Sequence, residues 1–164
     1  MPSTYEPIQS YTLASATATI TLNSIPSTYT DLRVVLVCSA ATGSVFPKAT
    51  YNNNTSSIYS STFLNGSGTS ASSNAVTSYA YIQMANNGAG SNPVIYTLDI
   101  FSYASSTFKT TLVTTSEDAN GSGAVARSVN LFQSTSAITR IDLYTGGNNF
   151  AIGTTATLYG IKNA

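Results

Sequence analysis

The chain has 164 residues with six basic and six acidic side chains, no His, no Trp and one Cys, so its formal net charge is zero. Charged residues make up 7% of it, against about 25% in an average globular domain, so the surface must be built from hydroxyl and amide groups. Without His, no Ser-His-Asp or Cys-His nucleophile and no imidazole metal site can form. Six scattered basic residues cannot neutralise a nucleic-acid backbone, and a single Cys forms no internal disulfide.

The same arithmetic predicts one folded domain of ordinary size. Disordered chains combine few aromatic residues with high net charge, whereas this chain has eleven Tyr and six Phe. It contains no long apolar run and no basic-then-apolar leader, so we expect neither a membrane span nor secretion. We therefore expect a protein that binds no nucleic acid, no membrane, no cofactor and no metal.

In chain order, the apolar residues alternate with a period of two, which is typical of half-buried strands. The first clear case, residues 16–22, has Thr at positions 17, 19 and 21 and apolar side chains between them. Residues 32–38 are apolar on both sides after Arg33, which predicts a central strand covered on both faces. Further strands are predicted at residues 58–64, 79–84, 94–101, 107–115, 125–132, 138–144 and 155–161.

Turn signals rich in Asn, Gly, Ser and Pro separate these segments, because Asn and Gly tolerate the positive φ of tight hairpins. About nine short strands without a fixed repeat predict an all-β, antiparallel sandwich of two sheets, similar to a jelly roll with eight or nine strands. We assign residues 1–10 to an N-terminal arm and residues 11–164 to a single β-sandwich domain. Residues 67–74 are expected to form an exposed, mobile loop.

Few side chains in this sequence could act in catalysis or bind a metal ion. Glu117 and Asp118 are adjacent, and they indicate either half of a Ca²⁺ site or, as the simpler interpretation, a solvated turn. Cys38 has no base or cation nearby in sequence, which predicts a small buried hydrophobic residue. We therefore predict no catalytic residue and a protein that is not an enzyme.

Asp99 lies in the middle of a predicted strand, between two aliphatic residues. A buried carboxylate needs a partner, for which Arg127, Arg140 and Lys109 are candidates. The simpler interpretation is that Asp99 faces solvent.

Tyr79 and Tyr81 fall on one face of a predicted strand. Exposed aromatic rings there could pack against the apolar faces of sugars while their hydroxyls stay in water. The alternative is that Tyr is simply a frequent half-buried strand residue. With the Asn-, Ser- and Gly-rich loops at 52–57 and 65–75, these two tyrosines are the candidate contacts for a glycan.

Three segments near the ends of the chain have a distinctive sequence: Thr4–Ile8 (TYEPI), Ser24–Leu32 (SIPSTYTDL) and Thr157–Lys162 (TLYGIK). They resemble small virion structural proteins of tailed bacteriophages, whose chains start and end in this way, whereas residues 44–92 match that group weakly. The resemblance implies a structural, decoration or fibre-like component of a phage particle, and it offers no catalytic residues.

The N-terminal segment suits such a role because Pro keeps an arm out of a sheet interior and free to reach a neighbour. Its candidate interface residues are Pro2, Tyr5, Pro7 and Ile8. Few charges also lower the desolvation cost of packing subunits together. We expect the partners to be copies of this chain, as a trimer or other closed oligomer, and other virion proteins such as the major capsid protein.

Two functions from different classes follow. The first is a non-enzymatic capsid decoration, or cement, protein that bridges neighbouring shell subunits on the exterior of the phage particle, after synthesis in the host cytoplasm. The alternative is a tail or fibre recognition module that binds a host surface glycan through Tyr79 and Tyr81. A hydrolase that uses Asp or Glu is a distant third.

Overall fold

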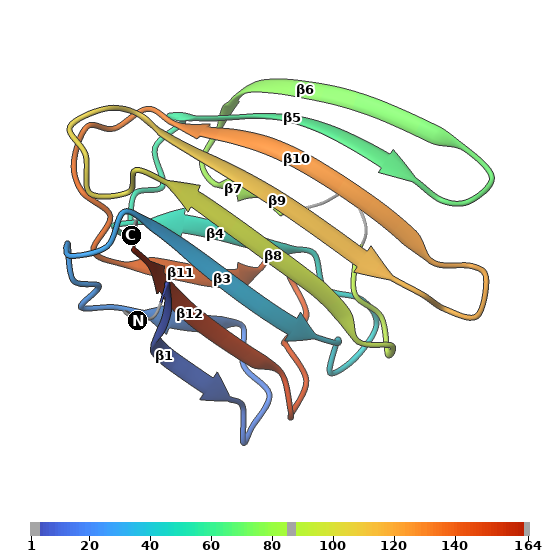
Figure 1. Ribbon diagram of the computed structural model, residues 1–164. Coiled ribbons are helices and arrows are strands. Elements are labelled where there is room, and N and C mark those ends of the chain that lie inside the picture. Colours follow the sequence, from blue (N-terminus) through green and yellow to red (C-terminus); the bar gives the residue numbers. More distant parts are fainter. Residues whose placement is uncertain (1–3, 85–87, 163–164) are drawn as a thin grey trace.

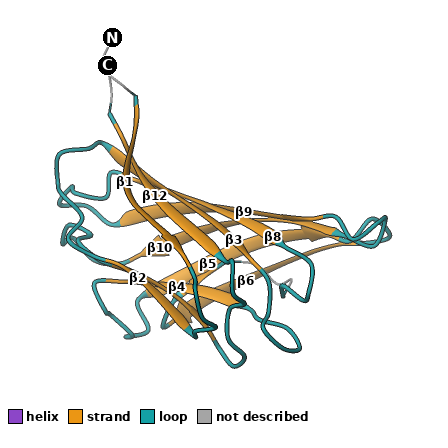
Figure 2. Ribbon diagram, turned by 90° about the horizontal axis from the view of Figure 1, so that it is seen from below, coloured by secondary structure: helices purple, strands orange, loops and turns teal. Residues whose placement is uncertain are grey.

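The computed structural model describes residues 4–84 and 88–162, and within them the chain forms strands and no helix. The strands make an eight-stranded and a four-stranded sheet, in which every pairing is antiparallel (Figures 1 and 2). This confirms the predicted all-β, two-sheet sandwich. The strands are β1 (Tyr5–Thr12), β2 (Thr19–Leu22), β3 (Asp31–Cys38), β4 (Pro47–Tyr51), β5 (Tyr59–Gly66), β6 (Ala71–Tyr79), β7 (Ile82–Gln83), β8 (Val94–Phe101), β9 (Lys109–Glu117), β10 (Ala124–Phe132), β11 (Ile141–Thr145) and β12 (Thr155–Ile161).

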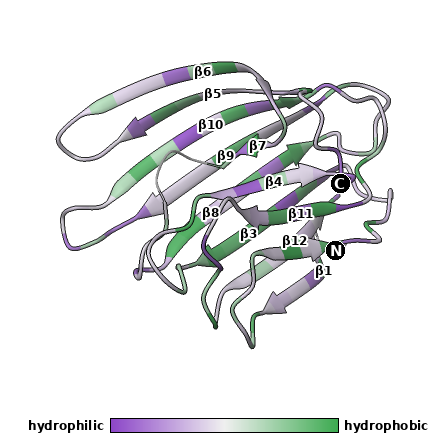
Figure 3. Ribbon diagram, turned by 180° about the vertical axis from the view of Figure 1, so that it is seen from behind, coloured by the Kyte–Doolittle hydropathy of each residue, from purple (hydrophilic) through white to green (hydrophobic). Residues whose placement is uncertain are grey.

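The large sheet has the strand order β1-β12-β3-β8-β9-β10-β5-β6, and the small sheet has the order β2-β11-β4-β7. The first strand pairs with the last, with Tyr5 opposite Ile161, so the two described ends of the chain lie side by side. Seen from behind, β4, β7 and β11 lie in front of the large sheet (Figure 3). With eight and four strands, the sheets are unequal, and the jelly-roll assignment stays a prediction.

The core lies between the two sheets and follows the alternation of the strands. In β3, Leu32, Val34 and Leu36 are fully buried against the small sheet. The residues between them, such as Val35, are only partly buried. The prediction that this strand is covered on both faces is therefore wrong, because the small sheet covers one face and no second layer covers the other within the described residues.

Residues 5–10, which we expected in an N-terminal arm, lie in β1 and pair with β12. Pro7 is tolerated because β1 is an edge strand, where a residue without an N–H breaks no interior ladder. The register shifts between Pro7 and Gln9, and Ile8 packs against the core. Pro2 lies outside the described residues, and a contact of this segment with another copy stays a prediction.

Residues 71–79 form β6, although their composition does not predict a strand. The expected loop at 67–74 is therefore wrong from residue 71 onward. Seven of its nine residues are exposed, and Val76 and Tyr79 are partly buried. Because neither face of β6 is covered, it needs no apolar alternation, and its ladder with β5 holds it in place.

The two sheets meet closely along β7, the edge strand of the small sheet. The backbone N–H of Gln83 donates to Oδ1 of Asn130 (3.1 Å), and Oγ of Ser128 donates to the carbonyl of Gln83 (3.0 Å). Oγ1 of Thr115 likewise donates to the carbonyl of Met84 (2.9 Å). Side chains of β9 and β10 thus take the place of a further strand and satisfy buried backbone groups.

Candidate functional site

Tyr79 and Tyr81 lie on either side of the corner between β6 and β7 rather than within one strand. Their rings nevertheless stack, with centroids 4.8 Å apart and planes 17° from parallel. Both rings are partly buried and line a surface groove of about 380 Å³. We call it the tyrosine groove; its other lining residues are Ser44, Phe46, Lys48, Gln83, Gly146, Gly147 and Asn148.

The tyrosine groove combines apolar rings with polar groups from distant parts of the chain. Nζ of Lys48 lies 4.3 Å from the ring centroid of Tyr81, a distance typical of a cation–π contact. A Cβ on Gly146 would stand 3.0 Å from the same Nζ, so glycine there leaves room for the ammonium. Asn148 reaches in from the loop after β11 and donates to the carbonyl of Ser44 (3.0 Å). Aromatic rings and hydrogen-bonding groups thus meet in one groove.

A second groove of about 240 Å³ lies on the outer face of the same small sheet. Its floor holds Asp142, whose carboxylate accepts two hydrogen bonds from Arg140 through Nε and Nη2 and one from Oγ1 of Thr21 (2.7 Å). The carboxylate raises the pKa of the Arg140 guanidinium. Tyr144 lines this groove and stands opposite Lys48 in the ladder, which links the two grooves.

The two loops that we expected beside the tyrosines are placed differently. The loop at 52–57 contributes Asn53 and Thr55 to the second groove. The region around 65–75 forms the tip of the β5–β6 hairpin, at the opposite end of β6 from Tyr79. It therefore does not join Tyr79 and Tyr81.

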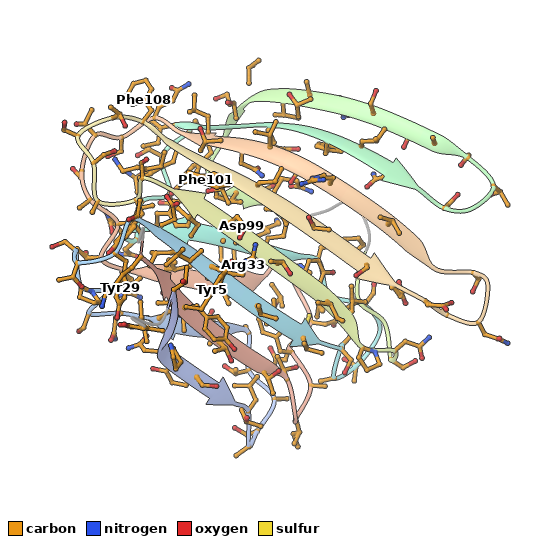
Figure 4. The ribbon with its side chains drawn as sticks, in the orientation of Figure 1. Tyr5, Tyr29, Arg33, Asp99, Phe101 and Phe108 are labelled. Atoms are coloured by element: carbon orange, nitrogen blue, oxygen red, sulfur yellow. The ribbon has the colours of Figure 1, made fainter. Side chains whose placement is uncertain are left out.

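The outer face of the large sheet is a second kind of surface, because no sheet covers it within the described residues. Ile95, Val125 and Val129 are about half exposed there, and Leu64 of β5 is 57% exposed. Phe101 continues this surface at the end of β8 (Figure 4). The charged residues that β3, β8, β9 and β10 place on this face are Asp31, Arg33, Asp99 and Arg127.

Asp99 has a partner that the sequence did not indicate. Nε of Arg33, directly opposite on β3, donates to its Oδ1 at 2.5 Å. The ring of Tyr5 lies 5.4 Å from the Arg33 guanidinium (Figure 4). Tyr159 meets that ring edge-on. The candidates Arg127, Arg140 and Lys109 are therefore wrong, because cross-strand register rather than sequence spacing pairs the charges.

The other potentially reactive side chains, those of Cys38, Lys109 and Asp118, are buried or hydrogen-bonded within the fold. Burial raises the pKa of the Cys38 thiol to about 12, and the prediction of a small buried residue is confirmed. The buried ammonium of Lys109 donates to the carbonyls of Ser105, Thr107 and Ser134. Asp118 accepts a hydrogen bond from the N–H of Gly121 (3.2 Å) within its turn.

In residues 4–84 and 88–162, no three His, Cys, Asp or Glu side chains gather where they could hold a metal ion. The same residues contain no helix long and apolar enough to cross a membrane. A scan against protein-family models, a search of curated proteins and a search of solved structures found no match for this chain. The function must therefore be inferred from the surfaces described above.

Proposed function

We propose that this protein is a non-enzymatic structural component of a tailed-bacteriophage virion, namely a capsid decoration, or cement, protein on the particle exterior. The observation that carries the proposal is the outer face of the large sheet, where Ile95, Val125 and Val129 are about half exposed. Large apolar side chains exposed together on one uncovered face indicate a site of protein association. The resemblance of the chain ends to phage structural proteins supports the assignment to a tailed-bacteriophage particle.

The proposed mechanism is interface burial. Docking this face on neighbouring shell subunits would remove aliphatic side chains from water, at about 25 cal/mol per Å² of apolar area. The Arg33–Asp99 pair keeps its partners when this face docks, whereas Arg127, between Val125 and Val129 on β10, would need an acceptor on the shell subunit to offset its desolvation. A stable contact needs roughly 800 Å² per partner.

The test compares charged variants on this face with a charged variant elsewhere. Virions lacking the protein are mixed with purified wild type, with the double variant V125K/V129K, or with Thr69→Lys at the exposed β5–β6 tip. Wild type and Thr69→Lys should sediment with the particles and raise their thermal stability. The double variant should bind at least about tenfold more weakly, because two buried lysines exceed the 1.4 kcal/mol that a tenfold change requires. Particles that neither bind the protein nor gain stability would refute the proposal.

The second candidate function is recognition of a host glycan on a tail or fibre. The stacked Tyr79 and Tyr81 beside Lys48 favour it, because they offer ring surface and hydrogen-bonding groups in one groove. Calorimetric titration of host polysaccharides should show binding that Tyr79→Ala and Tyr81→Ala abolish. Tyr11→Ala on β1, an exposed tyrosine outside the groove, should leave binding unchanged. Flat titrations across the polysaccharides would remove this candidate.

We also propose that the topology is a jelly roll with two inserted hairpins. With β5, β6, β9 and β10 set aside, the sheets have the orders β1-β12-β3-β8 and β2-β11-β4-β7. The first strand then pairs with the last and the second with the last but one, as in two nested Greek keys. The hairpins β5–β6 and β9–β10 pair through β5 and β10 and widen the large sheet. Nuclear Overhauser contacts between β2 and β11 should be present, and their absence would overturn this assignment.

A further inference from the structure

An apolar groove on the outer face of the large sheet lies where β10, β5 and β6 run side by side (Figure 1). We call it the Gly66 groove; its volume is about 360 Å³, and its lining residues are Leu64, Asn65, Gly66, Ala71, Val125, Ala126 and Arg127. Gly66 lies opposite Val125 on β10 and opposite Ala71 on β6. Gly66 has no side chain and Ala71 has only a methyl group, so the ladder is hollow at this point. The exposed side chains of Leu64 and Val125 border the hollow.

Arg127 is the charged residue of this groove, and it lacks the kind of partner that the other basic side chains have. The other five basic side chains each contact a carboxylate, backbone carbonyls or an aromatic ring: Arg33, Arg140, Lys162, Lys109 and Lys48. The guanidinium of Arg127 has no hydrogen bond, ion pair or ring contact with any residue in 4–84 or 88–162. In the ladder Arg127 stands between Leu64 on β5 and Thr114 on β9, neither of which is charged. The groove thus places a cation without a counterion among uncharged side chains.

This combination restricts the chemistry of a partner. Water solvates the Arg127 guanidinium while the face is open. A wholly apolar partner that covers the groove would remove this water and leave a buried charge without a counterion, which is strongly unfavourable. A carboxylate on the partner compensates for the lost water, because the planar fork of N–H donors matches its two oxygens in a bidentate contact. Arginine is also enriched among the residues that dominate the binding energy of protein interfaces.

We propose that the Gly66 groove receives an apolar side chain of a neighbouring shell subunit, and that a carboxylate beside this side chain pairs with Arg127. The inference rests on the proposed docking of the outer face to the shell, and it adds the chemistry of the partner. A second copy of this chain does not fit as the occupant. A twofold contact centred on the groove uses the same patch on both subunits, so the two Arg127 side chains would repel each other.

The first experiment fills the hollow from within. A Cβ on Gly66 would meet the carbonyl oxygen of Val125 at 3.9 Å, an ordinary van der Waals contact, and a β-branched residue suits a strand, so Gly66→Val should fold. The matched control is Gly147→Val in the tyrosine groove, where a Cβ would meet nothing within 4 Å. In sedimentation with virions lacking the protein, Gly66→Val should bind at least about tenfold more weakly than wild type, because the partner's apolar side chain stays in water. Gly147→Val should bind as wild type does, and circular dichroism checks that both variants are folded.

The second experiment removes the charge and keeps an apolar side chain. Arg127→Met should bind the particles at least about tenfold more weakly than wild type, because the partner's carboxylate is left buried and unpaired. Arg127→Lys should restore part of this loss. Particles whose carboxylates are first converted to neutral amides with carbodiimide and ethanolamine should bind wild type and Arg127→Met about equally, since the pair can no longer form.

The opposite result is equally clear. If the shell has no carboxylate at this place, Arg127→Met should bind as tightly as wild type or more tightly, because no guanidinium has to be desolvated, and the proposal is overturned. A difference between the two proteins that survives amidation would also overturn it. Wild type that does not bind the particles refutes the proposed function and this inference with it. Wild type that binds and is weakened by V125K/V129K, but not by Gly66→Val or not by Arg127→Met, refutes this inference alone.

Discussion

The buried face of the large sheet has two halves of different chemistry. On β12, β3 and β8 the inward side chains are aliphatic or aromatic, as in Leu158, Val34 and Leu98. On β9, β10 and β5 many of them are hydroxyls or amides; Thr111 and Asn130 are examples, and both are buried. Both halves alternate in and out with the same period of two.

The difference reflects what lies opposite each half. The apolar half faces the middle of the small sheet, whose backbone groups pair within their own ladder. The polar half faces β7, the edge strand of the small sheet. The backbone N–H and carbonyl of Gln83 on this strand need hydrogen-bond partners, which side chains of the large sheet provide. A buried backbone group without a partner costs about 1–3 kcal/mol. The period of the strand thus determines which residues point inward, and the layer opposite determines whether those side chains are apolar or polar.

The largest effect is expected in the apolar half. Leu98→Ala should lower the free energy of unfolding by about 3–5 kcal/mol, because Leu98 is fully buried and its removal leaves a cavity. Urea denaturation of the variant measures the loss. Thr97→Ala on the outer face is the control and should change stability by less than about 0.5 kcal/mol; similar losses in both variants would contradict the layer assignment.

The second largest effect is expected at alkaline pH, which should lower the free energy of unfolding through the polar half. Burial raises the pKa of Tyr59 from 10.0 to about 12 and also raises the pKa of Tyr51, whose hydroxyl contacts Thr111. A raised folded pKa means stability that is complete below pH 10 and lost as the pH rises through about 12. Tyr59 alone should account for a loss on the order of 3 kcal/mol. Urea midpoints and tyrosinate absorbance over this range report it; a midpoint independent of pH would refute the burial of these phenols.

Removing a single amide should reveal the role of the polar half. Asn130→Ala leaves the N–H of Gln83 and the hydroxyl of Ser61 without their acceptor, so stability should fall by about 2–3 kcal/mol. Val129→Ala, one residue away and half exposed, provides the matched control with a loss below about 1 kcal/mol. If the two variants unfold at the same urea concentration, the edge of β7 is not held by this side chain.

The smallest effect is expected on the outer face. Asp99→Asn removes the charge that pairs with Arg33, and the two side chains are 19% and 35% exposed. Water screens such a pair, so the loss should be about 0.2–1 kcal/mol. The difference from wild type should shrink in about 1 M NaCl, measured by thermal unfolding at two salt concentrations. A larger loss that salt does not alter would place this pair in the core.

Strands with one face on the core and one face open could be located from the sequence. The predicted segments 94–101 and 155–161 coincide with β8 and β12, because one covered and one open face produce clear alternation. β1, β4 and β6 were missed. β1 and β6 are edge strands held by pairing rather than by burial, whereas β4 is short, starts with Pro47 and is buried at four of its five positions, so it shows no alternation. Within the candidate site, the sequence placed Tyr79 and Tyr81 together, but Lys48 and Asn148 come from distant segments that only the folded chain brings to the groove.

By itself, the sequence determined the fold class and the low-charge surface, because periodicity and composition are local properties of the chain. The tertiary structure alone decided that Arg33 pairs with Asp99, that β9 and β10 carry polar side chains toward β7, and that β6 is left as an open edge. These features depend on strand order and register. Contacts between residues far apart in the chain determine both. The alternation within a single strand does not indicate which strands pair with it or in which register.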